Sequence, residues 1–133
     1  MSTLTPTTRT EQAAAAVTSL TPVQFATEAD DAHTVVVDLR EVDERVAHGS
    51  IAHSVHVPRG VLEFRADPTH VGHDPRLRPD QRVLLYCADG ARSVLAEASL
   101  RPLGYHDVAH LHGGLVAWSA AQLPLVGRMR SPY

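Results

Sequence analysis

One stretch of the chain decides its fold: Val83-Leu84-Leu85-Tyr86-Cys87-Ala88-Asp89-Gly90-Ala91-Arg92-Ser93. The continuous apolar run at its start is typical of a buried parallel strand. Ser93 is a good N-cap for the helix-rich residues that follow it. The stretch therefore predicts a strand, a tight turn and a helix, with the single cysteine of the chain in the turn.

Cys87 is the candidate nucleophile of this chain. In an open α/β sheet, a strand-to-helix turn lies at the carboxyl ends of the strands, where ligands bind. Unpaired backbone N–H groups and the positive end of a helix dipole stabilise a thiolate at such a place, and Arg92 adds a cation. A lone cysteine is otherwise often a small buried hydrophobe. The position of Cys87 at a strand end favours catalysis.

Strands alternate with helices along the rest of the chain. Thr21 caps a short helix that Pro22 opens, and residues 66–81 predict a long surface loop. This alternation predicts an α/β fold in which helices cover both faces of a parallel sheet. The expected strands span 34–39, 54–57, 83–86 and 108–111, and the other expected helices span 41–47, 58–64, 93–101 and 114–122.

Four blocks of the chain resemble, in order, segments of the rhodanese-like sulfurtransferases. Residues 87–93 are similar to the active-site loop of that family. The resemblance implies a rhodanese-like three-layer fold, with a central, mostly parallel sheet of about five strands and helices on both faces. The other three blocks are residues 35–51, which include Glu44, residues 56–64, and residues 103–118, where Trp118 is expected to anchor the last helix.

The resemblance also implies an enzyme, a rhodanese-type sulfurtransferase. The Cys87 thiolate would attack the outer sulfur of a donor such as thiosulfate, and the resulting persulfide would pass its sulfur to a thiol or to cyanide. This cycle needs no metal and no organic cofactor. Backbone amides of the loop would hold the anionic sulfur, and the loop consists of Ala88, Asp89, Gly90, Ala91, Arg92 and Ser93.

Three further residues are candidates for the rim of the pocket. Asp38 and Arg40 flank a predicted strand end, where an ion pair that holds the next loop is the alternative that we favour. Arg59 follows a proline, and it either meets an anionic substrate or is a solvated surface residue. Asp89 places an anion in the loop where many active family members carry a neutral or basic residue, so we expect it to weaken the attraction for anionic donors.

Three other functions compete with small-molecule sulfur transfer. A phosphatase or arsenate reductase uses a similar thiolate loop, but related phosphatases have one more residue between Cys and Arg than the four that separate Cys87 and Arg92. A non-catalytic binding or regulatory module would share the fold, although such modules often lose the cysteine. A persulfide carrier would receive its sulfur from a protein partner in a sulfur relay, and Asp89 would handicap it less.

The composition argues against several other classes of protein. The formal net charge is −3, with 12 arginines and no lysine against 15 acidic residues and no block of like charge, so binding to nucleic acid or to a membrane is not indicated. The 9 histidines are scattered. Although His110 and His112 would share one face of a strand, we expect no metal site.

The length and the single cysteine predict one domain in a reducing compartment. A chain of 133 residues suits a single domain, and a lone thiol without an internal disulfide suits the cytoplasm. No signal sequence is evident in the first residues. We expect a flexible leader at 1–18, a rhodanese-like domain at 19–127 and a C-terminal tail at 128–133.

Overall fold

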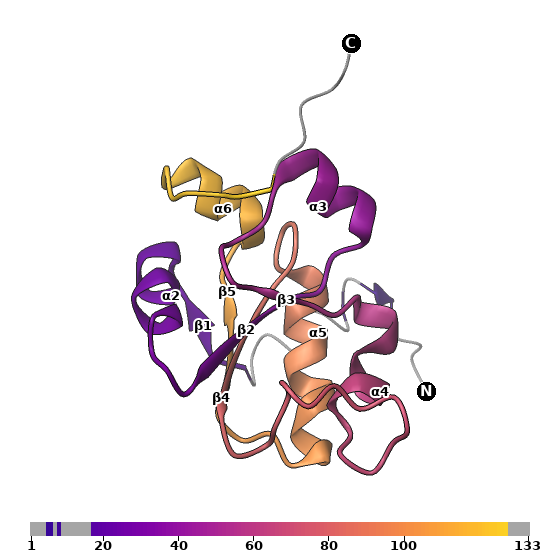
Figure 1. The fold of residues 1–133 in the computed structure, drawn as a ribbon. Coiled ribbons are helices and arrows are strands. Elements are labelled where there is room, and N and C mark those ends of the chain that lie inside the picture. The colour runs from indigo at the N-terminus through magenta and orange to yellow at the C-terminus, as the bar shows by residue number, and fades with distance from the viewer. Residues whose placement is uncertain (1–4, 7, 9–16, 128–133) are drawn as a thin grey trace.

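The structure, a computed structural model, describes residues 5, 6, 8 and 17–127. A parallel sheet lies at its centre, as predicted (Figure 1). The predicted tail at 128–133 and most of the predicted leader at 1–18 lie outside the described residues. The strands follow the order β1 (Ser19–Leu20), β5 (Val108–Leu111), β4 (Arg82–Tyr86), β2 (Thr34–Asp38) and β3 (Val55–His56).

Helices cover both faces of the sheet, which confirms the predicted three-layer α/β fold. Figure 1 shows α2 (Pro22–Ala29) and α6 (Gly114–Ala120) on one side, and α4 (Leu62–Ala66) and α5 (Ala91–Leu100) on the other. Helix α3 (Val42–His48) lies at the end of the molecule where β2 and β4 finish. Two short 3₁₀ turns, η1 (Arg59–Val61) and η2 (Arg101–Leu103), adjoin α4 and α5.

Strand β4 explains how one segment joins two cores. Its side chains alternate between the faces, so that Val83 and Leu85 pack into the core beneath α4 and α5, whereas Leu84 and Tyr86 pack into the core beneath α2 and α6. All four side chains are buried, which is why this strand reads as a continuous apolar run. The same alternation directs Cys87 toward the α5 side.

Two local predictions about the helices are confirmed. Thr21 caps α2, because its hydroxyl accepts the N–H of Gln24 at 3.2 Å while the Gln24 side chain accepts the N–H of Thr21 at 3.0 Å. Trp118 is buried and anchors α6, since its ring meets Phe25 edge-on with centroids 6.1 Å apart. Its indole N–H donates to the carbonyl of Pro124 at 3.0 Å.

Two features differ from the prediction. Ser93 is not the N-cap of the helix after the loop, because α5 begins at Ala91 behind Gly90, which has a φ of +101°. The sequence analysis placed only four of the roughly five strands that the resemblance implies, and the fifth is β1, which pairs with β5 at the edge of the sheet. Two residues are too few to show an alternating pattern, so no local signal marks this strand.

Within the described part of the chain, none of the helices has the length and apolar character needed to cross a bilayer.

Candidate active site

Cys87 lies directly after β4, at the carboxyl end of a central strand, and is fully buried. Its sulfur accepts the backbone N–H of Gly90 at 3.1 Å and contacts the Ser93 hydroxyl at 3.7 Å. Among the described residues, Gly90 supplies the only loop amide that is hydrogen-bonded to this sulfur. The thiol therefore sits in a small polar cradle at the start of α5.

Ser93 supports this cradle from inside α5. Its hydroxyl donates to the carbonyl of Gly90 at 3.0 Å, so the side chain bridges the first turn of the helix instead of capping it. Gly90 has a positive φ that side chains with a Cβ adopt only at a cost. The turn at Gly90 brings its N–H back toward the Cys87 sulfur.

The start of α6 holds the loop from the other side. The N–H of Leu115 donates to the carbonyl of Cys87 at 2.9 Å, and the N–H of Val116 donates to the carbonyl of Ala88 at 3.0 Å. A Cβ on Gly114 would lie 2.6 Å from the carbonyl carbon and oxygen of Ala88, which is closer than real contacts allow. Glycine at this position therefore lets α6 approach the loop backbone.

Asp89 is the exposed acidic residue of the loop. One oxygen of its carboxylate accepts the N–H of Ala91 at 3.1 Å. The Asp89 carboxylate thus already accepts a backbone N–H at the start of α5. This bond removes one of the free N–H donors that the sequence predicts for binding an anion.

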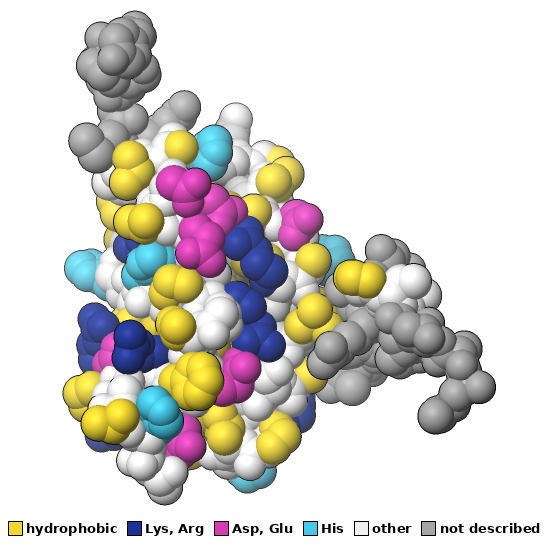
Figure 2. All heavy atoms as spheres, turned by 90° about the vertical axis from the view of Figure 1, so that its right-hand side faces the viewer, with side chains coloured by type: hydrophobic (Ala, Val, Ile, Leu, Met, Phe, Trp, Pro, Cys, Tyr) yellow, Lys and Arg dark blue, Asp and Glu magenta, His cyan; other side chains and the backbone are white. Residues whose placement is uncertain are grey.

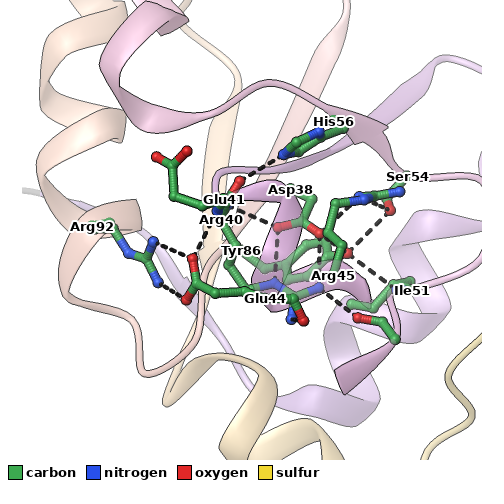
Figure 3. A network of polar contacts seen from close by, with 11 residues as sticks. Asp38, Arg40, Glu41, Glu44, Arg45, Ile51, Ser54, His56, Tyr86 and Arg92 are labelled. Atoms are coloured by element: carbon green, nitrogen blue, oxygen red, sulfur yellow. Dashed lines mark hydrogen bonds and ion pairs between the residues drawn. The ribbon is translucent and has the colours of Figure 1, made fainter. Parts of the chain in front are cut away.

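Arg92 forms an ion pair with Glu44 of α3 (Figure 3). The two guanidinium nitrogens donate to the two carboxylate oxygens at 2.9 Å and 2.7 Å, a bidentate arrangement. Hydrogen bonding to Arg92 lowers the pKa of Glu44 to about 2. The bond to Glu44 in turn raises the pKa of Arg92. Both groups are charged at neutral pH, and Glu44 ties the loop to α3.

Asp38 and Arg40 form a buried pair beneath α3 (Figure 3). Arg40 donates to both carboxylate oxygens of Asp38, at 3.0 Å and 2.9 Å, and also to the carbonyl of Gly49 at 2.6 Å. Burial raises the pKa of Asp38, but the hydrogen bonds from Arg40 outweigh burial and lower it. This arrangement matches the ion pair that we favoured, in which Asp38 and Arg40 hold the loop after β2.

Tyr86 and Arg45 extend this network. The Tyr86 hydroxyl donates to Asp38 at 2.9 Å and accepts the N–H of Ile51 at 3.1 Å, while Arg45 donates to Asp38 at 2.8 Å. Burial, followed by the charge of Asp38, raises the pKa of Tyr86 to about 12. The network therefore joins β2, β4 and the segment after α3 into one rigid support for the loop.

Arg59 lies in η1 and pairs with Glu63 of α4. It also donates to the Ser99 hydroxyl of α5 at 3.0 Å. These contacts attach η1 and α4 to α5. Within the described residues, no hydrogen bond or ion pair joins Arg59 to the loop that carries Cys87.

A pocket of about 450 Å³ lies beside the loop, between α3 and α6. Ala88 forms one part of its wall, and Glu44 and Arg40 form another. The remaining walls come from the apolar side chains of Leu115, Val116 and Leu125 and from the polar residues His48 and Ser119. The pocket therefore adjoins both the loop and the residue that holds Arg92.

Among the described residues, no group of three or more His, Cys, Asp or Glu side chains could hold a metal ion. His110 is buried and contacts Glu97 at 3.4 Å and the Ser19 hydroxyl at 3.2 Å. Glu97 also accepts the N–H of Thr18 at 2.9 Å. These residues attach β1 to β5 and α5.

Two glutamates have roles in the structure that the sequence does not predict. Glu44 appeared only as one position in a family signature, without a partner, and Glu97 was not singled out. Glu44 stands three residues after Glu41, whose N–H its carboxylate accepts at 2.7 Å, and this contact starts the helix that the sequence predicts at 41–47. Nothing near either glutamate in the sequence points to Arg92 or His110.

Known proteins resemble the chain over most of its length. The rhodanese-like domain profile matches residues 21–121. A sulfurtransferase from Allochromatium vinosum is 35% identical over 98 residues, which are 74% of this chain and 83% of that protein. The match to a sulfurtransferase supports the prediction of a rhodanese-type sulfurtransferase.

Two solved structures are also similar. A Rhodopseudomonas palustris protein of unknown function, described as a possible tyrosine phosphatase, has a TM-score of 0.87 and 31% identity, and the match covers 95% of this chain and 97% of that chain. The thiosulfate sulfurtransferase from Pseudomonas aeruginosa has a TM-score of 0.71 and 30% identity, and the match covers 90% of this chain and 22% of that chain.

Proposed function

The chain belongs to the rhodanese-like domain family, and from this premise we propose that it is a sulfurtransferase that carries sulfane sulfur on Cys87 as a persulfide. The observation that carries this proposal is the position of Cys87 at the end of β4, where its sulfur accepts the N–H of Gly90 at 3.1 Å. An amide so placed stabilises negative charge on the attacking thiolate and on the transferred sulfur. Residues 19–127 make up the proposed catalytic domain.

The proposed cycle has two steps. The Cys87 thiolate attacks the outer sulfur of a donor such as thiosulfate, a sulfur–sulfur bond forms on Cys87, and the donor leaves with the electron pair of the broken bond. A thiol or cyanide then takes the outer sulfur and releases the thiolate. Because Cys87 is fully buried, the loop must move to admit each partner.

Intact mass tests the cycle directly. Incubation with thiosulfate should add about one sulfur atom (~32 Da) to the protein, and cyanide or a thiol should remove it. The Cys87→Ser variant should remain folded and gain nothing. An equal gain by Cys87→Ser would refute a persulfide on Cys87.

A phosphatase is the second candidate, because the Rhodopseudomonas palustris protein of similar structure is described as a possible tyrosine phosphatase. Phosphate binding in a thiolate loop needs an arginine whose N–H groups face the oxyanion. Here Arg92 donates to Glu44 through two of its nitrogens, and only four residues separate it from Cys87. These observations favour sulfur transfer. Hydrolysis of p-nitrophenyl phosphate that depends on Cys87 would reverse this preference.

A persulfide carrier fed by a protein partner is compatible with the same loop. Asp89 supports it, because this exposed carboxylate repels small anionic donors such as thiosulfate. The same charge is less of a handicap when the sulfur arrives already attached to a protein. Slow loading from thiosulfate together with fast transfer of an existing persulfide would favour this version of the function.

A further inference from the structure

A second cavity, which we call the β2 groove, lies on the α2 side of the sheet and has a volume of about 370 Å³. It is lined by the end of α2, the start of β2, residues 51–53, Trp118 and Pro124. None of the described residues that line it belongs to the loop that carries Cys87. Sites for small molecules usually have volumes of roughly 300–1,000 Å³, so the β2 groove is large enough to hold a small ligand.

Most of the lining of the β2 groove is apolar. Val36, Ile51 and Trp118 are buried side chains that contribute to its walls. Ala26 and Ala29 of α2 also line it, and their single methyl groups leave space that longer side chains would fill. The ring or short chain of a ligand can therefore bury apolar surface here, which stabilises a complex by about 25 cal/mol for each Å².

One end of the β2 groove is acidic. Asp30 lines the groove as the C-cap residue of α2, its side chain is exposed, and no ion pair within the described residues compensates its charge. The C-terminal end of a helix adds partial negative charge at the same place. Asp31 follows Asp30, and its carboxylate accepts the N–H of His33 at 2.7 Å. This end of the groove therefore attracts a positively charged group.

The arginine closest to this end does not neutralise it. Arg82 of β4 stands in register with Thr34, which lines the groove. The guanidinium of Arg82 is already shared by two carboxylates, those of Glu28 and Asp107. The acidic side chains around Thr34 therefore outnumber the arginine beside them.

The other end of β2 carries the opposite charge. Arg40 and Arg45 share the single carboxylate of Asp38, which leaves one positive charge in excess. Asp38 lies four residues beyond Thr34 on β2, a separation of about 13 Å along the strand. The cationic part of a ligand is therefore drawn to the Asp30 end of the β2 groove.

His53 also lines the β2 groove, and its backbone is unusual. Its φ is +64°, a conformation that residues other than glycine seldom adopt. Such backbone conformations cost free energy and occur preferentially at sites that bind ligands. The conformation of His53 is therefore an independent sign of a ligand site here.

We propose that the β2 groove is a binding site for a small organic cation, a protonated amine attached to an aromatic ring or a short apolar chain. The ammonium group donates to the carboxylate of Asp30, and the apolar part packs against Val36, Ile51 and Trp118. This site does not include Cys87, so the proposal does not depend on sulfur transfer.

The fluorescence of Trp118 measures binding, because Trp118 is the only tryptophan of the chain and lines the β2 groove. Two probes with the same carbon skeleton isolate the effect of charge. The amine 2-phenylethylamine is protonated at neutral pH, whereas 2-phenylethanol is uncharged. Each probe is titrated into the wild-type protein, with excitation at a wavelength that phenyl rings do not absorb. The amine should bind about fivefold more tightly than the alcohol, which is the upper range for an exposed ion pair.

Asp30→Asn tests the acidic end of the β2 groove. Asparagine has nearly the same shape as aspartate but no charge, so the variant should bind the amine and the alcohol with affinities within about twofold of each other. Its affinity for the alcohol should stay within about twofold of the wild-type value. An unchanged preference for the amine would overturn the role of Asp30.

Asp43→Asn is the matched control. Asp43 is also an exposed acid, but it lies in α3 and does not line the β2 groove. Figure 2 shows acidic side chains gathered beside basic ones in the upper part of the molecule, where α3 lies. This variant removes the same charge from the protein and should keep the preference of the wild-type protein for the amine. Loss of the preference here would show that net charge, and not the groove, attracts the probe.

Ala29→Leu tests the apolar part of the β2 groove. The longer side chain would occupy the space of the ligand, so both probes should bind at least about tenfold more weakly. Leucine is a good helix former, and circular dichroism checks that the variant is folded. Unchanged binding to the folded variant would contradict a site in the β2 groove.

Amide NMR spectra of the wild-type protein locate the probe without any variant. Addition of 2-phenylethylamine should shift the signals of Thr34, Val36 and Ile51. Shifts gathered at Val116 and Ser119 would place the probe in the pocket beside the loop and would overturn the proposal, as would equal affinities for the two probes or no binding of the amine. None of these results bears on sulfur transfer, because neither measurement involves Cys87.

Discussion

Replacement of Gly114 by alanine should displace the loop that carries Cys87. A Cβ at this position would lie 2.6 Å from the carbonyl carbon and oxygen of Ala88, whereas ordinary contacts begin at 3.4 Å. Helix α6 and the loop would therefore have to separate by about 0.8 Å. The backbone of Gly114 also has a φ of +60°, a conformation that alanine adopts at a cost.

Both effects have a predictable size. The left-handed backbone costs an alanine about 1–2 kcal/mol, and overpacking against the loop backbone adds about 1–3 kcal/mol. The free energy of unfolding should fall by about 2–5 kcal/mol in Gly114→Ala. A displacement of about 1 Å at a reacting group can slow a reaction about 100-fold, so loading of Cys87 should slow by a similar factor.

Gly104→Ala is the matched control. Gly104 has a φ of +94°, but the nearest atom to its added Cβ would be Pro79 Cβ at 3.8 Å, an ordinary contact. This variant should lose only the backbone part, about 1–2 kcal/mol, and should load Cys87 at the wild-type rate. Urea denaturation measures the free energy of unfolding, and rapid-quench mass spectrometry measures loading. If both variants lose equal stability and both load normally, the close approach of α6 does not position the loop.

The remaining predictions concern charge. Hydrogen bonding to Arg92 lowers the pKa of Glu44 from 4.5 to about 2, so this ion pair contributes stability that is fully present above about pH 4.5 and is lost as the pH falls toward 2. Urea titrations should therefore show Glu44→Gln losing less stability than the wild-type protein between pH 5 and pH 2. Parallel pH profiles of the two proteins would contradict this. Asp38→Asn should lower the free energy of unfolding by about 3–5 kcal/mol, because it leaves the buried Arg40 without its carboxylate; a loss under about 1 kcal/mol in urea would show that the buried pair is not needed for stability. Asp89→Lys should speed loading of Cys87 from thiosulfate, and an unchanged or lower rate in the mass assay would show that this loop charge does not repel the donor.

Much of the fold is visible in short stretches of sequence. The apolar run before Cys87 forms β4, and the alternation of strands with helices gives the observed parallel sheet. Thr21 and Gln24 form the capping box that starts α2. The boundary at Ser93 was wrong, because the residues that follow Gly90 can enter a helix without a side-chain cap when α6 and the cradle around the sulfur already fix the turn.

The sequence by itself determined the order of the elements after β1, the α/β class and the place of Cys87 between a strand and a helix, because apolar runs and caps act between residues a few positions apart. Only the tertiary structure decided the charge beside the sulfur. Arg92 and Glu44 are 48 positions apart, and Glu97 and Thr18 are 79 positions apart. Such pairs form only when packing brings α3 over the loop and β1 against β5, so no local pattern specifies them.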